Sequence, residues 1–577
     1  MKRYFKYIKP YMLSFILGPI LMIVEILGEI VLPKLMSLII NKGIVEHNVG
    51  YISAMGGAMI GIAFLMMIGG VGGAYFGAKA SINFAADLRK DTFKSVQTFS
   101  FSNIDSFSTG SLVTRLTNDI TQVQNFVNMS LRMMLRAPGM LIGAVIMAFV
   151  MNARLAVIVL IVVPIILVLI VIVISLAFPR FQALQEKMDK LNSAIREALT
   201  NVRVIKSFVR DDFEKTKFET ANSDLKASSM KAFKVMITTG PLMGLMMNIT
   251  TLAVVWYGGK QILVGDMPVG DLTAFTSYVA QILISLVMSS FVILQSSRAI
   301  ASAKRINEVL DCQSDINDEN AAYPDKKVEN GSVEFKNVSF RYYKESSDPV
   351  LDHVSFKIES GETVGIIGST GSGKTTLVSF IPRLYDVDEG EVLVDAIDVK
   401  DYSLKNLRDG VSMVLQKNVL FSGSIEENLK WGKEDATMEE IRSVADMAQA
   451  DGFVTGFAEG YDTDLGQGGV NVSGGQKQRL CIARAMLKKP KILILDDSTS
   501  AVDTATEAKI RESLKSYCPD TTKIIIAQRI SSVIEADKIV VIDDGRVVGM
   551  GTHDELIKDC EAYKEIYYSQ MDKEVSA

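Results

Sequence analysis

The sequence predicts two fused parts: a membrane domain of six helical spans, followed by a soluble α/β domain. Long stretches without Asp, Glu, Lys or Arg occur only before about residue 300, among them 49–78, 137–153 and 155–178. A polar segment at 311–327 ends this region. Beyond it, short apolar runs alternate with polar turns and helical patterns, as in α/β domains.

Each long uncharged run is long enough for a membrane helix. A run of about 20 apolar residues crosses the bilayer core, whereas buried helices of soluble proteins have shorter runs of about 10–14. The predicted spans are 11–33, 52–78, 131–152, 155–178, 240–262 and 273–295. The predicted domains are therefore a membrane domain at 1–311, a linker at 312–330 and an α/β domain at 331–577.

The distribution of Lys and Arg predicts the orientation. These residues are frequent in 1–10, 79–136 and 179–234, but the segments 41–50 and 257–271 contain one each. Positive segments remain on the cytoplasmic side, so we expect the N terminus and both long charged segments there. Apolar residues recur at helical spacing in these segments, which predicts that the spans continue as two protruding helical hairpins. No cleavable signal peptide is expected, because the first apolar run has full span length.

Composition excludes some partners. A net charge of −5 gives no overall basic surface, so no nucleic acid is expected as a partner. The four cysteines form no CxxC pair and lie in the part predicted to be cytosolic, where thiols remain reduced. They are Cys312, Cys481, Cys518 and Cys560.

Two features inside the predicted spans need an explanation. Glu25 and Glu29 lie one turn apart, on one face of the first span. Carboxylates in a bilayer are costly and suggest a substrate or cation site. Alternatively, they lie near the outer end and pair with an Arg or face water. The second span contains small-xxx-small pairs, which predict close helix packing: Gly57/Gly61, Gly69/Gly73 and Gly73/Gly77.

The stretch 364-VGIIGSTGSGKTTLVSFI-381 predicts a nucleotide phosphate site. It matches G-x-x-x-x-G-K-[ST] between a strand pattern and a helix pattern. The glycines let backbone N–H groups converge on phosphate oxygens, and the helix N terminus adds its dipole. Lys374 is expected to reach the β- and γ-phosphates of ATP, and Thr375 to bind Mg²⁺. The predicted ATP-binding residues here are Gly368, Ser369, Thr370, Gly371, Ser372, Gly373, Lys374, Thr375 and Thr376.

A second buried strand, 491-KILILD-496, ends in an aspartate. Ligand-binding side chains of α/β sheets lie at the carboxyl ends of strands. We therefore expect Asp496 to hold Mg²⁺ through water. The alternative is an ordinary surface aspartate after a strand.

A third element resembles a known family. The segment 471-NVSGGQKQRLCIARAMLKKPKILILDD-497 closely resembles the signature region of ABC ATPases, with Ser473, Gly474, Gly475 and Gln476 directly before a helix. In that family two nucleotide domains meet head to tail, and each signature covers the ATP held by the other domain. The resemblance also implies that Tyr342 stacks on adenine, that Gln416 contacts Mg²⁺, and that 500-SAVD-503, including Asp503, crosses the dimer interface.

Six spans fused ahead of such a domain resemble a half-transporter of the exporter type. The resemblance implies ATP and Mg²⁺ as cofactors, a second half-transporter as partner, and a prokaryotic plasma membrane as location. It further implies short cross-helices at the hairpin tips, near 100–108 and 206–213. Hydrophobic drugs or lipids are the default substrate class. The many methionines suit an adaptable apolar cavity, although methionine is also an ordinary packing residue.

The sequence departs from the family at three positions. Asp497 lies where the family has the glutamate that polarises water, and Gln528 lies where it has a histidine that contacts the γ-phosphate. Gln467 replaces an acid in the loop before the signature. A displacement of about 1 Å in a positioned group can cost about a hundredfold in rate, and Gln cannot carry charge or relay a proton.

The departures affect hydrolysis, while the residues expected to bind ATP and to form the signature are intact. We therefore expect this chain's own site to bind ATP and hydrolyse it slowly, and its signature to complete an active site in a different partner chain. The alternative pairing is a homodimer with two slow sites. The alternative functions are an importer built on the exporter fold and an ATP-gated regulator of another membrane protein.

Overall fold

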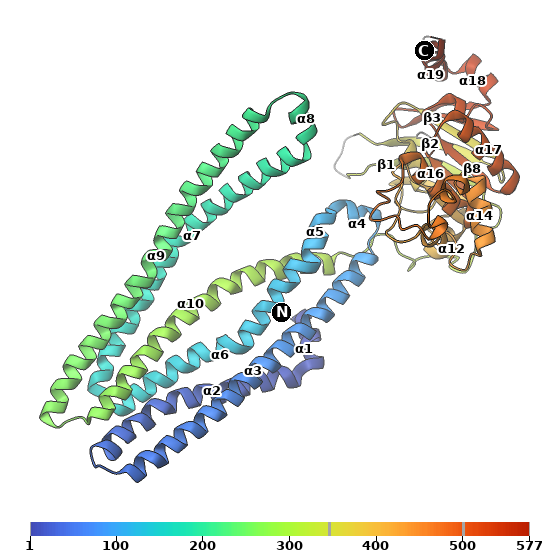
Figure 1. Cartoon of the computed structure of the whole chain (residues 1–577). Helices are drawn as coiled ribbons and strands as arrows, with labels where there is room; N and C mark the ends of the chain where they lie inside the picture. Colours follow the sequence, from blue (N-terminus) through green and yellow to red (C-terminus); the bar gives the residue numbers. More distant parts are fainter. Residues whose placement is uncertain (1, 344–347, 499–501, 576–577) are drawn as a thin grey trace. The chain divides into compact units, whose positions relative to one another are not determined.

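The computed structural model describes residues 2–343, 348–498 and 502–575. They form two units (Figure 1). The membrane unit consists of residues 1–97 and 109–311, and the α/β unit consists of 98–108 and 312–577. The sequence analysis expects the membrane domain to be the continuous segment 1–311. The structure differs in one respect: residues 98–108 belong to the α/β unit.

Six helices of the described membrane unit are long and apolar enough to cross a bilayer, as the sequence predicts. Each carries one of the predicted spans and most extend well past it. They are α2 (Met12–Leu38), α3 (Val49–Gln97), α6 (Ile120–Met151), α7 (Ala153–Thr200), α9 (Asp211–Val264) and α10 (Val269–Asp311). Shorter elements connect them: α1 (Lys2–Ile8), η1 (Lys9–Tyr11), η2 (Ile39–Ile44), α5 (Thr109–Thr114) and η3 (Arg115–Asp119).

Helices α7 and α9 form a long hairpin, with α8 (Val202–Ser207) at its tip (Figure 1). The sequence predicts this cross-helix near 206–213, but the structure places it several residues earlier. Residues from Asp211 onward already belong to α9, whose first turn contains Asp211, Asp212 and Glu214. Acidic side chains stabilise a helix N terminus through its dipole, which favours the start of α9 at this point.

Two of the three predicted glycine pairs lie where α2 meets α3. A Cβ atom on Gly69 would lie 2.8 Å from the carbonyl oxygen of Leu21, and one on Gly73 would lie 2.6 Å from the sulfur of Met22. Gly57 and Gly61 have nothing within 4 Å of such a Cβ. The pairs 69/73 and 73/77 therefore allow close helix packing, and the pair 57/61 does not serve this purpose within the described chain.

The α/β unit contains two sheets. One is six-stranded, in the order β10-β9-β3-β8-β7-β6, and is parallel except for the β10–β9 pair. Its strands are β3 (Thr363–Gly368), β6 (Val411–Val414), β7 (Ile492–Asp496), β8 (Thr522–Ile526), β9 (Lys538–Asp543) and β10 (Arg546–Gly551). The other is antiparallel, in the order β2-β1-β4-β5, with β1 (Val333–Phe340), β2 (Leu351–Ile358), β4 (Glu389–Val394) and β5 (Ile397–Asp398).

Helices surround these sheets and complete two apolar cores, one on each side of β3 and β7. They are α11 (Lys374–Ser379), α12 (Leu404–Gly410), α13 (Ile425–Lys430), α14 (Met438–Met447), α15 (Asp451–Val454), α16 (Gly474–Leu487), α17 (Thr504–Tyr517), α18 (His553–Asp559) and α19 (Glu561–Val575). All four cysteines are free thiols. Alternate residues of each buried strand contribute to opposite cores, as expected for a sheet covered on both faces.

The α/β unit also includes α4 (Phe101–Ser106), a short cross-helix in the predicted 100–108 region. The hydroxyl of Tyr385 donates a hydrogen bond to Asp105 at 2.7 Å, and its ring lies 6.0 Å from that of Phe101. Ser100 donates to Asp315 at 3.1 Å. Burial and the neighbouring Asp105 carboxylate raise the pKa of Tyr385, so its hydroxyl remains a donor. These contacts attach α4 to the folded α/β unit.

A buried ion pair holds α10 against η3 in the membrane unit. Asp119 is 2% exposed and accepts hydrogen bonds from Ser302 at 2.8 Å and from Arg305 Nε at 2.8 Å. Burial favours the protonated acid, but the hydrogen bonds from Arg305 and Ser302 outweigh it and lower the pKa of Asp119. The ionised form of Asp119 is therefore more strongly stabilised in the folded state than in the unfolded state.

We expect Asp119→Asn to lower the free energy of unfolding by about 1–2 kcal/mol, since hydrogen bonds to charged groups contribute about 1.5–3 kcal/mol and Arg305 is partly hydrated. Thermal unfolding in detergent measures this. Because the folded pKa is lowered, the contribution is full above the ordinary carboxyl range near 3.9, and is lost as the pH falls through the folded pKa. Asp311→Asn removes an exposed pair with Arg3 and should change little; an equal loss in both variants would contradict the prediction.

Candidate nucleotide-binding and hydrolysis site

The parallel sheet gathers the predicted site residues at one edge. Strands β3, β8, β7 and β6 are parallel neighbours, so their carboxyl ends lie side by side. The glycine loop follows β3, Gln528 follows β8, Asp496 ends β7 and Gln416 follows β6. Residues separated by up to 160 positions thus meet at the place where α/β sheets bind ligands.

The backbone of the glycine loop requires its glycines. Gly368 has φ +155°, and a Cβ there would lie 1.9 Å from the carbonyl oxygen of Ile542. Gly373 adopts φ +93° as the N-cap of α11, a conformation that other residues rarely adopt. The loop therefore leads directly into the helix N terminus, and its backbone N–H groups are available for phosphate oxygens.

The ammonium of Lys374 lies back over the loop. It donates hydrogen bonds to the carbonyl oxygens of Gly368 at 3.0 Å and Ser369 at 2.6 Å. Burial lowers the pKa of Lys374, and the carboxylates of Asp496 and Asp497 oppose this shift. A cation held by weak carbonyl acceptors in a partly buried loop is well placed to exchange them for anionic phosphate oxygens.

Thr375 and Asp496 form the pair expected for a metal ion. The Thr375 hydroxyl donates to Asp496 Oδ1 at 3.1 Å. Asp496 is 1% exposed, and its Oδ2 atom has no hydrogen-bond partner among the described residues. A buried carboxylate oxygen with no donor beside a hydroxyl oxygen fits a hard cation such as Mg²⁺. Burial raises the pKa of Asp496, and a bound dication would reverse that effect.

Two of the three residues that depart from the family contact each other. Gln528 donates from Nε2 to Asp497 Oδ2 at 2.8 Å, and Gln416 donates to the same oxygen at 3.4 Å. Asp497 adopts φ +46°, a region that Asp tolerates better than most residues. Its N–H donates to the carbonyl oxygen of Ile526, which fixes the backbone. Burial raises the pKa of Asp497, and the amide donors oppose this shift.

Tyr342 lies beside the helix that follows the glycine loop. Its hydroxyl forms a hydrogen bond of 2.9 Å with Thr376 Oγ1, and its ring lies edge-on to that of Tyr385. The side chain is 45% exposed, so one part of the ring is open to solvent. An exposed aromatic face near the loop is suited to stacking on a purine.

The signature residues form a capping box at the start of α16. The Ser473 hydroxyl accepts from the N–H of Gln476, and the Gln476 side chain accepts from the N–H of Ser473. No hydrogen bond between described residues joins 473–476 to the glycine loop at 368–376.

Two further predicted residues lie outside the sheet edge that gathers the glycine loop, Asp496, Gln416 and Gln528. Asp503 is the N-cap of α17 and accepts from the N–H of Thr506 at 3.0 Å. Ser500 and Ala501 of the same motif lie outside the described residues. Gln467 is exposed in the loop before the signature, between two glycines at positive φ.

The sequence analysis gave an arginine partner for the two membrane glutamates as an alternative, but it did not identify which arginine. Arg136 of α6 donates to Glu25 at 2.8 Å and to Glu29 at 2.6 Å. One guanidinium thus satisfies one oxygen of each carboxylate. Arg132 lies one turn earlier on the same helix. The sequence does contain a signal, because Arg132 and Arg136 lie four residues apart at the start of an apolar run. The helix that these arginines face depends on tertiary packing, which this pattern does not predict.

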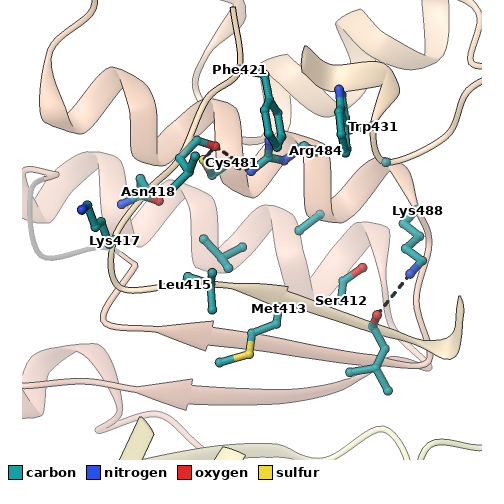
Figure 2. A pocket seen from close by; sticks show the side chains of 15 residues that line it. Ser412, Met413, Leu415, Lys417, Asn418, Phe421, Trp431, Cys481, Arg484 and Lys488 are labelled. Atoms are coloured by element: carbon teal, nitrogen blue, oxygen red, sulfur yellow. Dashed lines mark hydrogen bonds between the residues drawn. The ribbon is translucent and has the colours of Figure 1, made fainter. Parts of the chain in front are cut away.

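A groove of about 310 Å³ lies between β6 and α16 (Figure 2). The stacked rings of Phe421 and Trp431 form one wall, with centroids 4.1 Å apart. Arg484 donates to the carbonyl oxygen of Val419 at 3.0 Å, and Cys481 lies beside it. The groove also includes Leu415 and Lys417, the neighbours of Gln416.

These features define a nucleotide-dependent membrane protein, and comparison with known proteins identifies its family. The family profile "ABC transporter transmembrane region" matches residues 15–287, and the profile "ABC transporter" matches 351–500. The chain belongs to the ABC transporter family. It combines the family's membrane domain and ATPase domain in one chain, is an ATP-hydrolysing transporter, and has the fold of an ABC exporter.

Relatives match over the whole chain. The Bacillus subtilis "Uncharacterized ABC transporter ATP-binding protein YfiB" is 40% identical over 576 residues, covering 100% of both chains. The "Putative multidrug export ATP-binding/permease protein YgaD" of the same organism is 32% identical, covering 99% of both. The solved structure of a bacterial Atm1-family ABC exporter with ATP bound has a TM-score of 0.77 at 23% identity, covering 98% of both chains, which shows a shared fold.

We expect Lys374→Ala to weaken ATP binding about 10–100-fold, because it removes a charge-assisted contact to phosphate. Equilibrium titration of the purified full chain with a fluorescent ATP analogue measures the dissociation constant. Lys417→Ala, an exposed lysine beside the groove, is the matched control and should bind as the unaltered chain does. Unchanged affinity in Lys374→Ala would show that ATP does not use this loop.

Proposed function

We propose that this chain is the catalytically impaired half of a heterodimeric exporter. The observation that carries the proposal is the direct hydrogen bond between Asp497 and Gln528. Two of the three positions that depart from the family, Asp497 and Gln528, form one local unit in which an amide holds a carboxylate. The departures therefore change a single catalytic function, the activation of water beside the γ-phosphate.

Both changes weaken hydrolysis by known physical routes. Aspartate ends one methylene short of glutamate, and a misplacement of about 1 Å can cost about a hundredfold in rate. Gln528 also occupies the Asp497 oxygen that would otherwise accept a proton from water. A glutamine can donate to phosphate, but it carries no charge and relays no proton. ATP binding depends on other residues, chiefly the loop around Lys374.

The signature supports an active partner site. Ser473 and Gln476 form a reciprocal capping box at the start of α16, so the N terminus of this 14-residue helix is preformed. Such a terminus, with glycines that permit close approach, is suited to the phosphates of a nucleotide. In the proposed dimer it covers ATP held by the partner's loop. Mg²⁺, held by Thr375 and Asp496, would neutralise phosphate charge in this chain's own site.

The second hairpin supports association with another chain. At its tip Phe208 is 74% exposed and Val209 is 81% exposed. Met230, Phe233 and Ile237 are also exposed on α9. Apolar surface of this kind marks an interaction site. A second half-transporter is the partner of fitting architecture, and the homodimer with two slow sites is the alternative.

Transport of apolar substrates follows from the family and the composition. We propose export of hydrophobic drugs or lipids from the cytoplasmic side of a prokaryotic plasma membrane, with the N terminus and ATPase domain in the cytoplasm. The positive segments support that orientation. The relative YgaD, a putative multidrug export protein by name, supports drugs as the substrate class. In inverted vesicles an exporter accumulates substrate in the lumen. An importer would instead release preloaded substrate from the lumen, and an ATP-gated regulator would show no transport.

We expect the double substitution Asp497→Glu with Gln528→His to raise hydrolysis at this chain's site about 10–100-fold, since it restores the reach of the carboxylate and a group that can transfer a proton. The assay uses the heterodimer with the partner's catalytic glutamate replaced by glutamine, so that only this site turns over. Adding Lys374→Ala should remove the gain. A double variant no faster than the parent would contradict the assigned cause of impairment.

A further inference from the structure

A cavity of about 200 Å³ in the membrane unit lies outside the site described above. Its walls come from α2, α6 and α10. Four methionines contribute much of its surface: Met22, Met129, Met133 and Met288. Methionine side chains are flexible and polarisable, so such a wall adapts to apolar ligands of varied shape. The cavity is a place where a chain of carbon atoms could bind.

The same cavity contains two arginines. Arg136 is committed to Glu25 and Glu29 through its two terminal nitrogens. The structure gives Arg132 neither a hydrogen bond nor an ion pair with any described residue. Arg132 is exposed at the start of the third predicted span, so its charge is accessible to a ligand that enters the cavity. Arg132 is therefore the available charge of the cavity.

Packing fixes the stem of Arg132 and supplies a polar neighbour. A Cβ atom on Gly77 would lie 3.5 Å from Arg132 Cγ, so the small residue on α3 leaves room for the arginine stem. Asn128 lies one turn earlier on α6, and its buried Oδ1 atom has no partner among the described residues. An unsatisfied buried acceptor is costly unless a ligand or water donates to it. A headgroup that combines an anion with a hydroxyl would satisfy both residues.

We propose that this cavity binds an anionic amphiphile, whose phosphate or carboxylate headgroup is held by Arg132 and whose apolar chain lies against the methionines. The inference rests on the proposed exporter function and narrows its substrate class from hydrophobic to acidic. It also revises the role of the glutamates. Neither Glu25 nor Glu29 lines the cavity, and both accept from Arg136; they hold that arginine in place instead of binding a cation.

Native mass spectrometry of the purified full chain in a neutral detergent tests the proposal. The probes are lysophosphatidate, lysophosphatidylcholine and hexadecyltrimethylammonium, which share a long chain and differ in charge. Lysophosphatidate should bind at least about tenfold more tightly than the other two, because a charge-assisted contact contributes that much. Equal binding of the cationic and anionic probes would overturn the proposal.

Substitutions locate the site. Arg132→Gln should weaken lysophosphatidate binding about tenfold, and Arg132→Lys, which keeps the charge, should retain most of it. Arg180→Gln on α7 is the matched control and should bind normally, because the Arg180 guanidinium donates to the carbonyl oxygen of Leu176 and to no other described residue. Thermal unfolding establishes that each variant is folded. If Arg132→Gln is not folded, binding to Arg132→Lys is measured in its place. Unchanged binding in Arg132→Gln would overturn the assignment.

Competition distinguishes the amphiphile from free phosphate. Millimolar inorganic phosphate should not displace lysophosphatidate, because the methionine wall contributes to binding; full displacement would overturn the apolar part of the proposal. The assay contains neither ATP nor a partner chain. A failure of binding is therefore separate from a failure of the heterodimer proposal, which is measured by ATP turnover.

Discussion

The parallel pairing of β3, β8, β7 and β6 is the constraint on which the ATPase site depends. Parallel strands bring their carboxyl ends to one edge, so four loops from distant parts of the sequence converge there. Lys374, Asp496, Gln416 and Gln528 reach one another only because of this register. A shift of one residue in any strand would reverse its side chains and separate the set.

The same edge explains why two substitutions act as one. Asp497 and Gln528 follow neighbouring strands, and the hydrogen bond between them ties their side chains together. The substitution Gln528→His alone would leave the short Asp497 carboxylate beside a histidine. The substitution Asp497→Glu alone would leave a glutamate beside the Gln528 amide. The loop that binds phosphate lies on a third strand and keeps its own geometry. Binding and hydrolysis can therefore separate in one site, which is the physical basis of the proposal that this subunit is impaired but still holds ATP.

Much of this fold could be predicted from local sequence. Long uncharged runs predicted six membrane helices, and the glycine loop and the Asp496 strand predicted an α/β ATPase domain, because these signals depend on neighbouring residues alone. The position of α8 was predicted several residues too late, since the pattern did not reveal the acidic first turn of α9. The attachment of α4 to the α/β unit depends on Tyr385, far away in the chain.

The membrane carboxylates show the same limit. Glu25 and Glu29 were recognisable from one helix, but their interpretation depended on Arg136, which lies more than a hundred residues away. The role of Arg136 can be recognised only when the packing of α6 against α2 is known. Arg132, which has no partner among the described residues, and its methionine-lined cavity likewise depend on the tertiary packing of helices whose individual patterns indicate only a bilayer.

The most direct test of the central claim is ATP turnover of the purified chain, alone and together with its partner half-transporter. The account predicts almost no turnover by the chain alone, and active hydrolysis by the pair that is lost when the partner's catalytic glutamate is replaced. Robust turnover by the chain alone, abolished by Asp497→Asn, would contradict it. That result would make Asp497 a working base in a homodimer.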